Sequence, residues 1–273
     1  MDLTEYIPHL SASQLDTFRR CPQQWYYSYV EGLKIPPGIA LLVGSGVHKG
    51  AEVDLKTKIV TGQDEPLDVV LDAAVTEYDS RMRKEGLFLT RDEMAAKAQT
   101  IGAGKDETVA LASLWHEESA PEILPAMVEE RMSIDAPGLA VPLFGIIDLY
   151  EQDGVLRDLK TAKSQWRQDK ADTETQPTLY RELIMARTGE YPRMVAYDIL
   201  VKTKKPKRQQ LATERTQADF DVLVGRAQLM LRQIKAGIFP PADPGQWWCS
   251  PKFCGYYGFC KHIPDRLRRL PNV

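Results

Sequence analysis

A predicted β-hairpin in residues 141–160 constrains the fold more than any other stretch of the chain. Residues 142–150 are mostly apolar, residues 152–154 (Gln-Asp-Gly) suit a tight turn, and residues 155–160 alternate between apolar and polar. This pattern predicts two adjacent strands that run in opposite directions.

The hairpin carries two acids and a lysine. Asp148 lies in the first predicted strand, and Leu156, Asp158 and Lys160 share one face of the second strand because side chains alternate along a strand. Two carboxylates beside an ammonium group can hold a divalent metal and activate a water. On spacing alone, an ordinary solvent-exposed hairpin explains the same residues equally well.

The bulk properties indicate a globular protein with a local site. The 273 residues, 43% of them hydrophobic, can bury a full core, and we favour one domain with an insertion. The net charge of −3 predicts that a polyanion would be met by a local patch. No apolar run approaches the roughly 18 residues of a membrane span, and the first five residues lack a signal-peptide pattern, so we expect a cytoplasmic protein without a membrane partner.

The N-terminal part contains a lone cysteine and a histidine of interest. Ser11 or Ser13 can cap a helix that leads to Cys21, which lies among aromatic residues. A single buried cysteine usually serves packing. Further on, His48 follows a glycine-rich approach at the start of a predicted helix, where small residues allow close contact with another element. His48 is thus a candidate ligand, although a structural histidine is commoner. His9 and His116 fit no pattern that indicates a site.

The sequence predicts that residues 66–118 form a helical arm. Apolar residues recur with a helical period from Leu67 to Tyr78, and a second helix is predicted from Met94 to Leu114. Residues 101–106 superficially resemble a phosphate-binding loop, but the pattern lacks its first glycine and its Ser or Thr. We therefore reject a nucleotide site there, and with it motor activity.

A strand predicted over residues 126–134 brings two glutamates beside the hairpin. Either Glu129 or Glu130 could contact a metal or a water, although paired glutamates at a strand edge are more often solvated. After the hairpin we predict a polar loop as far as residue 172 and then a helix over residues 174–187. Gln176 and Tyr180 lie one turn apart on this helix and could contact a phosphate or brace the lysine. A tyrosine packed on the sheet beside an uninvolved glutamine is equally compatible.

The remaining predicted elements are a strand over residues 194–201 and a helix from Thr216 to about Gly237. Residues 202–208 between them form the densest positive run of the chain. Clustered cations at a hairpin tip suit nonspecific phosphate contact, and a solvated turn explains them equally well.

Three cysteines close the chain with the spacing C-x4-C-x5-C. Cys249, Cys254 and Cys260 lie in a segment rich in Gly and aromatic residues, and Cys21 supplies a fourth thiol. Four thiolates can hold a zinc ion or an iron-sulfur cluster. We favour the cluster, because zinc sites more often show C-x2-C pairs and aromatic shielding protects a cluster from water. Such a centre would tie the two ends of the domain together.

The order of these motifs resembles the RecB-type branch of the PD-(D/E)XK nucleases. His48, the segment Gly-Ile-Ile-Asp148, the triplet Asp158-Leu159-Lys160 and the Gln176-x-x-x-Tyr180 element follow one another, bracketed by one early and three late cysteines. Within this branch the chain looks most like the iron-sulfur exonucleases: the CRISPR-associated enzymes, the AddB-like nuclease domains and related phage recombination exonucleases. The resemblance covers nearly the whole chain outside the helical arm. Ile-Ile-Asp replaces the Pro-Asp of the family pattern, and the C-x4-C spacing is longer than the C-x2-C of many relatives.

The resemblance implies a role for each matching residue. His48, Asp148, Asp158 and the carbonyl of Leu159 would bind Mg²⁺ or Mn²⁺. Lys160 would position or deprotonate the attacking water and stabilise charge on the phosphate. Gln176 and Tyr180 would join the catalytic site and contact DNA. Four cysteines would bind a [4Fe-4S] cluster: Cys21, Cys249, Cys254 and Cys260.

We therefore expect an α/β protein with a restriction-endonuclease-like core, in which helices flank a central mixed sheet. A single nuclease domain would comprise N-terminal helices (1–60), a helical insertion (61–122), the catalytic sheet and helix (123–215), and a C-terminal helix with the cysteine-rich cluster loop (216–273).

The expected function is metal-dependent exonucleolytic hydrolysis of DNA, on a single strand or a duplex end, in recombination, repair or processing. A partner protein from those processes and an oligomer are both compatible with the sequence. The alternative is a noncatalytic nucleic-acid-binding module with a four-cysteine zinc site.

Overall fold

A computed structural model describes residues 7–263 as one six-stranded mixed sheet with helices on both sides. The first five residues, on which the prediction of a cytoplasmic protein partly depends, lie outside this range, as do the ends of the first and last predicted segments. The strands are β1 (Leu10–Ser11), β2 (Pro125–Ile134), β3 (Leu143–Glu151), β4 (Val155–Ala162), β5 (Met194–Val201) and β6 (Lys207–Thr213). The helices are α2 (Ala12–Arg20), α3 (Pro22–Tyr29), α4 (Ile39–Thr61), α5 (Leu67–Glu85), α6 (Arg91–Ala95), α7 (Lys97–Glu118), the 3-10 turn η1 (Ala120–Glu122), α8 (Gln168–Thr173), α9 (Gln176–Thr188) and α10 (Gln217–Lys235).

The sheet mixes parallel and antiparallel pairs. Its order is β1-β3-β4-β5-β6, and β2 pairs with β3 as well. The pairs β1–β3 and β4–β5 are parallel, whereas β2–β3, β3–β4 and β5–β6 are antiparallel. The predicted fold class, a mixed sheet flanked by helices, is confirmed.

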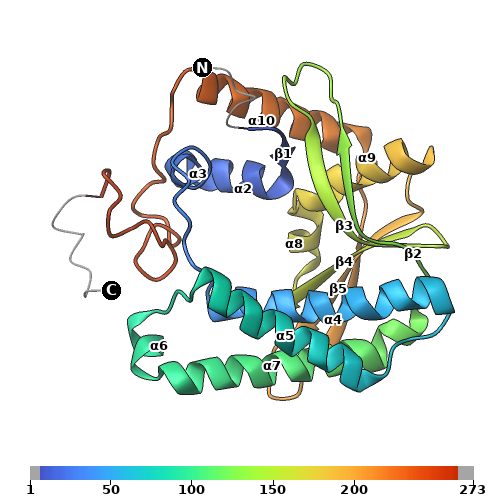
Figure 1. Ribbon diagram of the computed structural model, residues 1–273. Coiled ribbons are helices and arrows are strands. Elements are labelled where there is room, and N and C mark those ends of the chain that lie inside the picture. Colours follow the sequence, from blue (N-terminus) through green and yellow to red (C-terminus); the bar gives the residue numbers. More distant parts are fainter. Residues whose placement is uncertain (1–6, 264–273) are drawn as a thin grey trace.

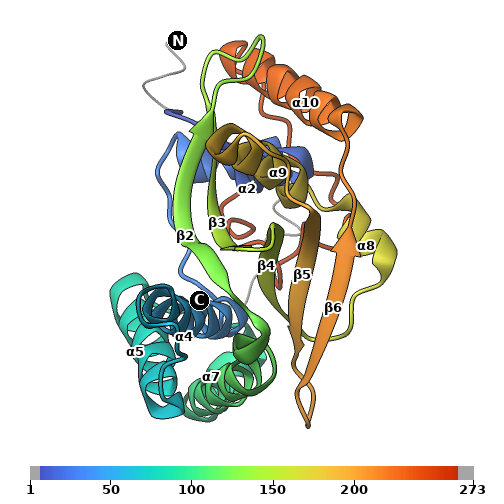
Figure 2. The same cartoon turned by 90° about the vertical axis from the view of Figure 1, so that its right-hand side faces the viewer.

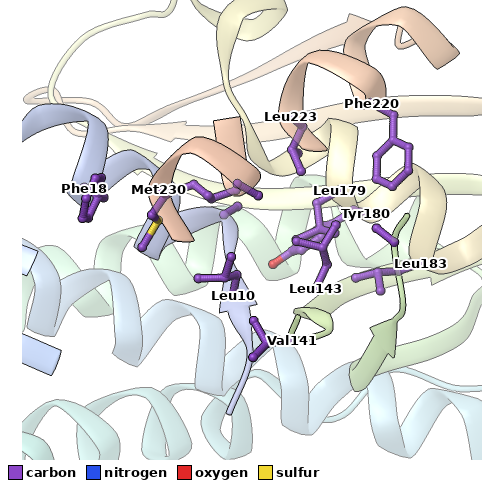
Figure 3. Packing of buried hydrophobic residues seen from close by; sticks show 14 of the residues in the cluster. Leu10, Phe18, Val141, Leu143, Leu179, Tyr180, Leu183, Phe220, Leu223 and Met230 are labelled. Atoms are coloured by element: carbon purple, nitrogen blue, oxygen red, sulfur yellow. The ribbon is translucent and has the colours of Figure 1, made fainter. Parts of the chain in front are cut away.

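Two hydrophobic clusters hold the helices onto the sheet. The first joins α2, α3, α9 and α10 to buried residues of β3 and β4, and Figure 3 shows part of it, with Leu143 of β3 beside Leu179 and Tyr180 of α9. The second joins α4, α5 and α7 to the other side of the sheet, with Val47 and Trp115 in its interior. Figure 1 shows the two helical groups on opposite sides of the sheet.

Most predicted elements are present with small shifts in their boundaries. The hairpin, the strands β2 and β5, the pair of long helices α5 and α7, and α10 with its capping box at Thr216 match the sequence prediction. The segment that resembles a phosphate-binding loop lies inside helix α7 and is not a loop. Among the described residues, none of the helices combines the length and hydropathy that a membrane crossing requires.

Three boundaries were predicted wrongly. Helix α4 begins at Ile39 rather than just before His48, since the helix runs through its own glycines. Met94 belongs to the short helix α6, which ends at Ala95 before α7 begins at Lys97. Helix α8 occupies part of the predicted polar loop, because Ala171 is fully buried and Asp172 accepts a hydrogen bond from Thr213 of β6 (2.8 Å). Tertiary contacts therefore stabilise a helix too short to form alone.

Glycines on α4 let this helix cross its neighbours closely. A Cβ atom at Gly46 would lie 2.7 Å from the carbonyl oxygen of Ala74 in α5 and 2.7 Å from Cγ2 of Thr108 in α7. A Cβ atom at Gly44 would lie 3.4 Å from Oγ1 of Thr161, at the end of β4. The close crossing places the following turn of α4, which carries His48, over the sheet.

We predict that Gly46→Ala lowers the free energy of unfolding by about 1–3 kcal/mol, because its methyl group must displace the backbone of α5. The control is Gly102→Ala in α7, where an added Cβ meets nothing within 4 Å. This change should raise stability by about 0.5–1 kcal/mol, because alanine favours a helix interior. Urea unfolding followed by circular dichroism measures both, and equal stability of the two variants would contradict the close crossing.

Candidate active site

The two hairpin acids lie where β3 and β4 separate. The ladder between these strands contains only two residue pairs, Leu149 with Arg157 and Tyr150 with Leu156. Asp148 and Asp158 would form the next pair. Instead, the N–H of Leu159 donates to Oδ2 of Asp148 (3.0 Å). In Figure 2, β3 continues beside β2 while β4 runs beside β5. At the level of the acids, the side chain of Asp148, and not a backbone ladder, connects β3 to β4.

Helix α4 brings a histidine to Asp148. Nδ1 of His48 lies 3.7 Å from Oδ2 of Asp148 and 3.9 Å from Oε1 of Glu129 on β2. Each residue offers one ligand atom, and these three atoms lie within 4.8 Å of one another. Imidazole and carboxylate groups at such distances can share one divalent cation.

Glu129 joins the site through an unusual backbone conformation. Its φ is 53°, the left-handed region, and among the described residues it is the only non-glycine with positive φ. Val128 and Glu130 pair with β3, but Glu129 has no partner in the register. Such conformations cost about 1–3 kcal/mol and concentrate at functional sites. The sequence left Glu129 and Glu130 as equal candidates, and the geometry brings Glu129 to the histidine while Glu130 is exposed.

The second acid and the lysine form a separate chain of contacts. Nζ of Lys160 forms an ion pair with Oδ2 of Asp158 (2.5 Å) and donates to Oε1 of Gln176 (2.9 Å). The amide Nε2 of Gln176 in turn donates to the hydroxyl of Tyr180 (2.6 Å). The structure therefore links all four predicted residues in one line, with Gln176 bracing the lysine. Oδ1 of Asp158 is buried without a hydrogen-bond partner.

The electrostatics show a surplus of negative charge. Asp158 is 3% exposed, and burial, with a smaller contribution from Asp148, raises its pKa to about 6 despite the opposing effect of Lys160. Burial alone would lower the pKa of His48, but Asp148 and Glu129 outweigh it and the pKa is raised. Lys160 behaves likewise, because two carboxylates overcome the effect of burial and raise its pKa. The raised pKa values of His48 and Lys160 show that the nearby carboxylates outweigh the effect of burial on both groups.

Tyr180 fits against the backbone of β3. A Cβ atom at residue 145 would lie 2.6 Å from Cε1 of Tyr180, so only Gly145 leaves room for the ring. Burial and the nearby charges of Asp148 and Asp158 raise the pKa of Tyr180. Its hydroxyl therefore stays protonated and can donate a hydrogen bond.

These residues face a cavity of about 1020 Å³, which we call the cleft. His9 and Phe144 also line it, with ring centroids 4.4 Å apart. The sequence assigned no role to either residue, and no local pattern marks them, because the two rings meet only through the pairing of β1 with β3. The lining residues that matter here are His48, Glu129, Asp148, Lys160, Gln176 and Tyr180.

All four cysteines line one small hollow beside helix α3. Sγ of Cys21, at the N-terminus of α3, accepts hydrogen bonds from the N–H groups of Gln24 (3.4 Å) and Ala242 (3.3 Å). Tyr27 and Tyr256 stack beside them with centroids 5.4 Å apart. Burial, with the neighbouring thiols adding to it, raises the pKa of Cys254 to about 11.

The basic run is only partly available for binding. The side chain of Lys202 is 5% exposed and lies beside Glu107 (3.3 Å), and Arg208 binds Asp198 (3.0 Å) and Glu122 (2.8 Å). These two cations serve the structure, contrary to the expectation that the whole run faces solvent or phosphate. The exposed members are Lys204, Lys205 and Lys207.

A model of the PD-(D/E)XK nuclease superfamily matches residues 9–261. The chain belongs to this superfamily. The segment Asp158-Leu159-Lys160 has the D-x-K pattern that appears in the superfamily name. Nucleases of this superfamily use divalent metals, and the group of His48, Glu129 and Asp148 offers a place for one.

A crystal structure from Eubacterium rectale, provisionally described as an exonuclease, shares the fold of this PD-(D/E)XK protein. It is 13% identical, covers 89% of this chain and 87% of its own, and aligns with a TM-score of 0.57. The structure of the protein SSO0001, also 13% identical, covers 92% of this chain and 95% of its own with a TM-score of 0.36, too low to support an argument. No curated protein matches the chain.

We predict that Glu129→Gln weakens Mn²⁺ binding by about 10–100-fold, because it removes one charged oxygen from the group around His48. Glu130→Gln is the matched control, since this neighbouring glutamate is exposed and should leave the affinity unchanged. Electron paramagnetic resonance of free Mn²⁺ measures both affinities. Equal affinities in the two variants would exclude Glu129 as a ligand.

Proposed function

We propose that the protein is a metal-dependent deoxyribonuclease, an exonuclease that acts on a single strand or a duplex end in DNA recombination, repair or processing. The proposal depends on one observation: a three-residue metal-ligand group and a braced lysine face the same cleft. Membership of the nuclease superfamily supports the reaction, hydrolysis of a phosphodiester.

The residues of the site fit a divalent cation. His48, Glu129 and Asp148 would hold Mg²⁺ or Mn²⁺, with Asp158 and the carbonyl of Leu159 as further ligands. The buried Oδ1 of Asp158 has no hydrogen-bond partner, so it is free to accept a cation. A bound divalent ion would lower the pKa of a water and offset charge on the phosphate.

The chain's own residues divide the remaining tasks. Hydrolysis adds water across a P–O bond and leaves a phosphate monoester and a hydroxyl. Lys160 is protonated, because the surrounding acids raise its pKa, so its ammonium can donate to a phosphate oxygen as negative charge develops. Gln176 fixes the position of this ammonium, and the hydroxyl of Tyr180 lies one hydrogen bond further along.

The alternative function, noncatalytic nucleic-acid binding, receives less support. Several carboxylates in one cleft would weaken the binding of nucleic acid to a noncatalytic module, because carboxylates repel phosphate. Burial of the Asp158 carboxylate destabilises the fold, and a surface that only binds nucleic acid does not require such burial. The strained φ of Glu129 adds a further cost at the same place.

We predict that Lys160→Ala and Asp158→Asn each lower the rate of DNA cleavage by about 100-fold or more, because each removes a charged group from the reacting centre. Asp153→Asn is the control: this acid lies in the turn of the same hairpin and is paired at the surface with Arg193. The measurement is a time course on end-labelled DNA with Mg²⁺ or Mn²⁺. Wild-type rates in both active-site variants, with native circular dichroism, would remove the nuclease proposal.

We further propose that Cys21, Cys249, Cys254 and Cys260 bind a structural [4Fe-4S] cluster. Two backbone N–H groups donate to Sγ of Cys21, as is usual around cluster thiolates. A tetrahedral zinc site would bring sulfur atoms to about 3.8 Å from one another. Among the described residues, only the group around His48 gathers three or more potential ligand atoms within 4.8 Å. The four thiols around one hollow and the two N–H groups that donate to Cys21 support the proposed cluster.

We predict that the purified protein is brown and contains about four iron atoms and four sulfide ions per chain. Cys254→Ser should lose the colour and lower the melting temperature, because the cluster joins the segment at residues 249–260 to α3. Ser250→Ala, which changes a neighbouring hydroxyl, should keep both. A colourless protein with one zinc per chain would replace the cluster by the zinc alternative.

A further inference from the structure

A second hollow continues from the cleft along the segment that follows β4. It has a volume of about 370 Å³, and Thr161 lines both this hollow and the cleft. The strand that carries Asp158 and Lys160 therefore leads directly from the proposed reacting centre into the hollow. We call the hollow the basic groove, and its lining residues are 161–167, 169 and 170.

The groove is positively charged, in contrast to the acidic cleft. Three of its nine lining residues are cationic, Lys163, Arg167 and Lys170, and one is acidic, Asp169, which leaves a net charge of +2 (3 − 1). All three cations are exposed. Arg167 lies 3.3 Å from Asp169, but both side chains are more than half exposed, so this pair contributes little and leaves the guanidinium free to rearrange.

The groove is built on a fixed segment. Gln209 of β6 accepts a hydrogen bond from the N–H of Trp166 (2.9 Å) and donates one to its carbonyl oxygen (2.9 Å). The indole ring packs against Tyr197 with centroids 5.0 Å apart. Nζ of Lys170 lies 3.7 Å from the centroid of the same indole ring. The tryptophan thus anchors the loop to the sheet and fixes the position of one ammonium.

The turn between β5 and β6 extends the positive surface. Strands β4 and β5 are parallel and pair Ala162 with Val201, so the segments that follow them leave the sheet side by side. The N–H of Lys202 donates to the carbonyl oxygen of Ala162 (2.7 Å). Figure 2 shows the β4–α8 loop and the β5–β6 turn at the same edge of the sheet. The turn adds three exposed cations, Lys204, Lys205 and Lys207.

We propose that the basic groove binds the phosphate backbone of the DNA strand outside the cleft, several nucleotides from the reacting centre. This inference rests on the proposed function, because it takes its ligand from the nuclease reaction. A chain of net charge −3 with an acidic cleft repels DNA at long range, and local cations beside the cleft overcome this repulsion. The groove determines affinity for long strands, whereas the cleft carries out the chemistry.

The test compares three full-length proteins: the wild type, a groove variant (Lys163→Gln, Arg167→Gln, Lys170→Gln) and a control variant (Arg226→Gln, Arg232→Gln, Lys235→Gln). The control removes three exposed cations from α10, on the other side of the molecule. Fluorescence anisotropy with EDTA present, so that no strand is cut, measures binding of single-stranded oligonucleotides of about 6 and about 20 nucleotides, lengths that bracket typical single-strand sites.

For the long oligonucleotide, the groove variant should bind about tenfold more weakly, and its plot of log K against log salt should be shallower by about 2, since each lost phosphate contact removes about 0.7. The short oligonucleotide should bind all three proteins equally. The control variant should match the wild type throughout.

An unchanged salt slope in the groove variant would overturn the inference, as would an equal loss of affinity in the control variant. An equal loss for the short oligonucleotide would also overturn it, because the cations would then act on the strand in the cleft. Mn²⁺-dependent cleavage of the long oligonucleotide by the wild type is assayed in parallel. Absence of cleavage there counts against the proposed nuclease, while the binding data still judge the groove.

Discussion

The separation of β3 from β4 is the structural feature on which the site depends. A continued antiparallel ladder would set Asp148 and Asp158 opposite each other, with Cα atoms about 4.5–5.5 Å apart and two carboxylates in one buried space. The ladder stops one pair earlier. Asp148 then accepts a hydrogen bond from the backbone of Leu159, so a side chain replaces the missing strand partner. Asp148 and Asp158 therefore have different neighbours, and helix α4 places His48 beside Asp148.

The separation of β3 from β4 also places the charged side chains in two groups. On the β3 side, Asp148 meets His48 and Glu129, an acid-rich group with no fixed cation. On the β4 side, Asp158 meets Lys160, whose ammonium is held by Gln176. Lys160 lowers the pKa of Asp158, but burial, with a smaller contribution from Asp148, outweighs this effect and the pKa is about 6. His48, Glu129 and Asp148 would hold a divalent ion that offsets part of the negative charge, and the ammonium of Lys160 would remain available to a phosphate.

The sequence predicts the elements better than the contacts between them. The hairpin, α9 and α10 follow from local periodicity and from turn and cap residues, so their patterns could be read directly. Glu129 could not be selected over Glu130, because strand alternation assumes regular φ values and residue 129 departs from them. Helix α8 depends on contacts with β6, forty residues further along the chain. The burial of Arg208 likewise depends on distant partners, Asp198 and Glu122.

The opposite charges of the cleft and the basic groove follow from a conflict that any metal-dependent nuclease faces. Carboxylates that hold a cation repel the phosphate that must approach it. The conflict can be resolved by distance, because salt screens exposed charges beyond about 8–10 Å. Lys163, Arg167 and Lys170 follow Lys160 along the chain and line a hollow that shares Thr161 with the cleft, so the proposed phosphate contacts are separate from the acids. In the proposed arrangement, the acids that would ligate the metal lie in the cleft, and the segment that follows β4 would bind the polyanion.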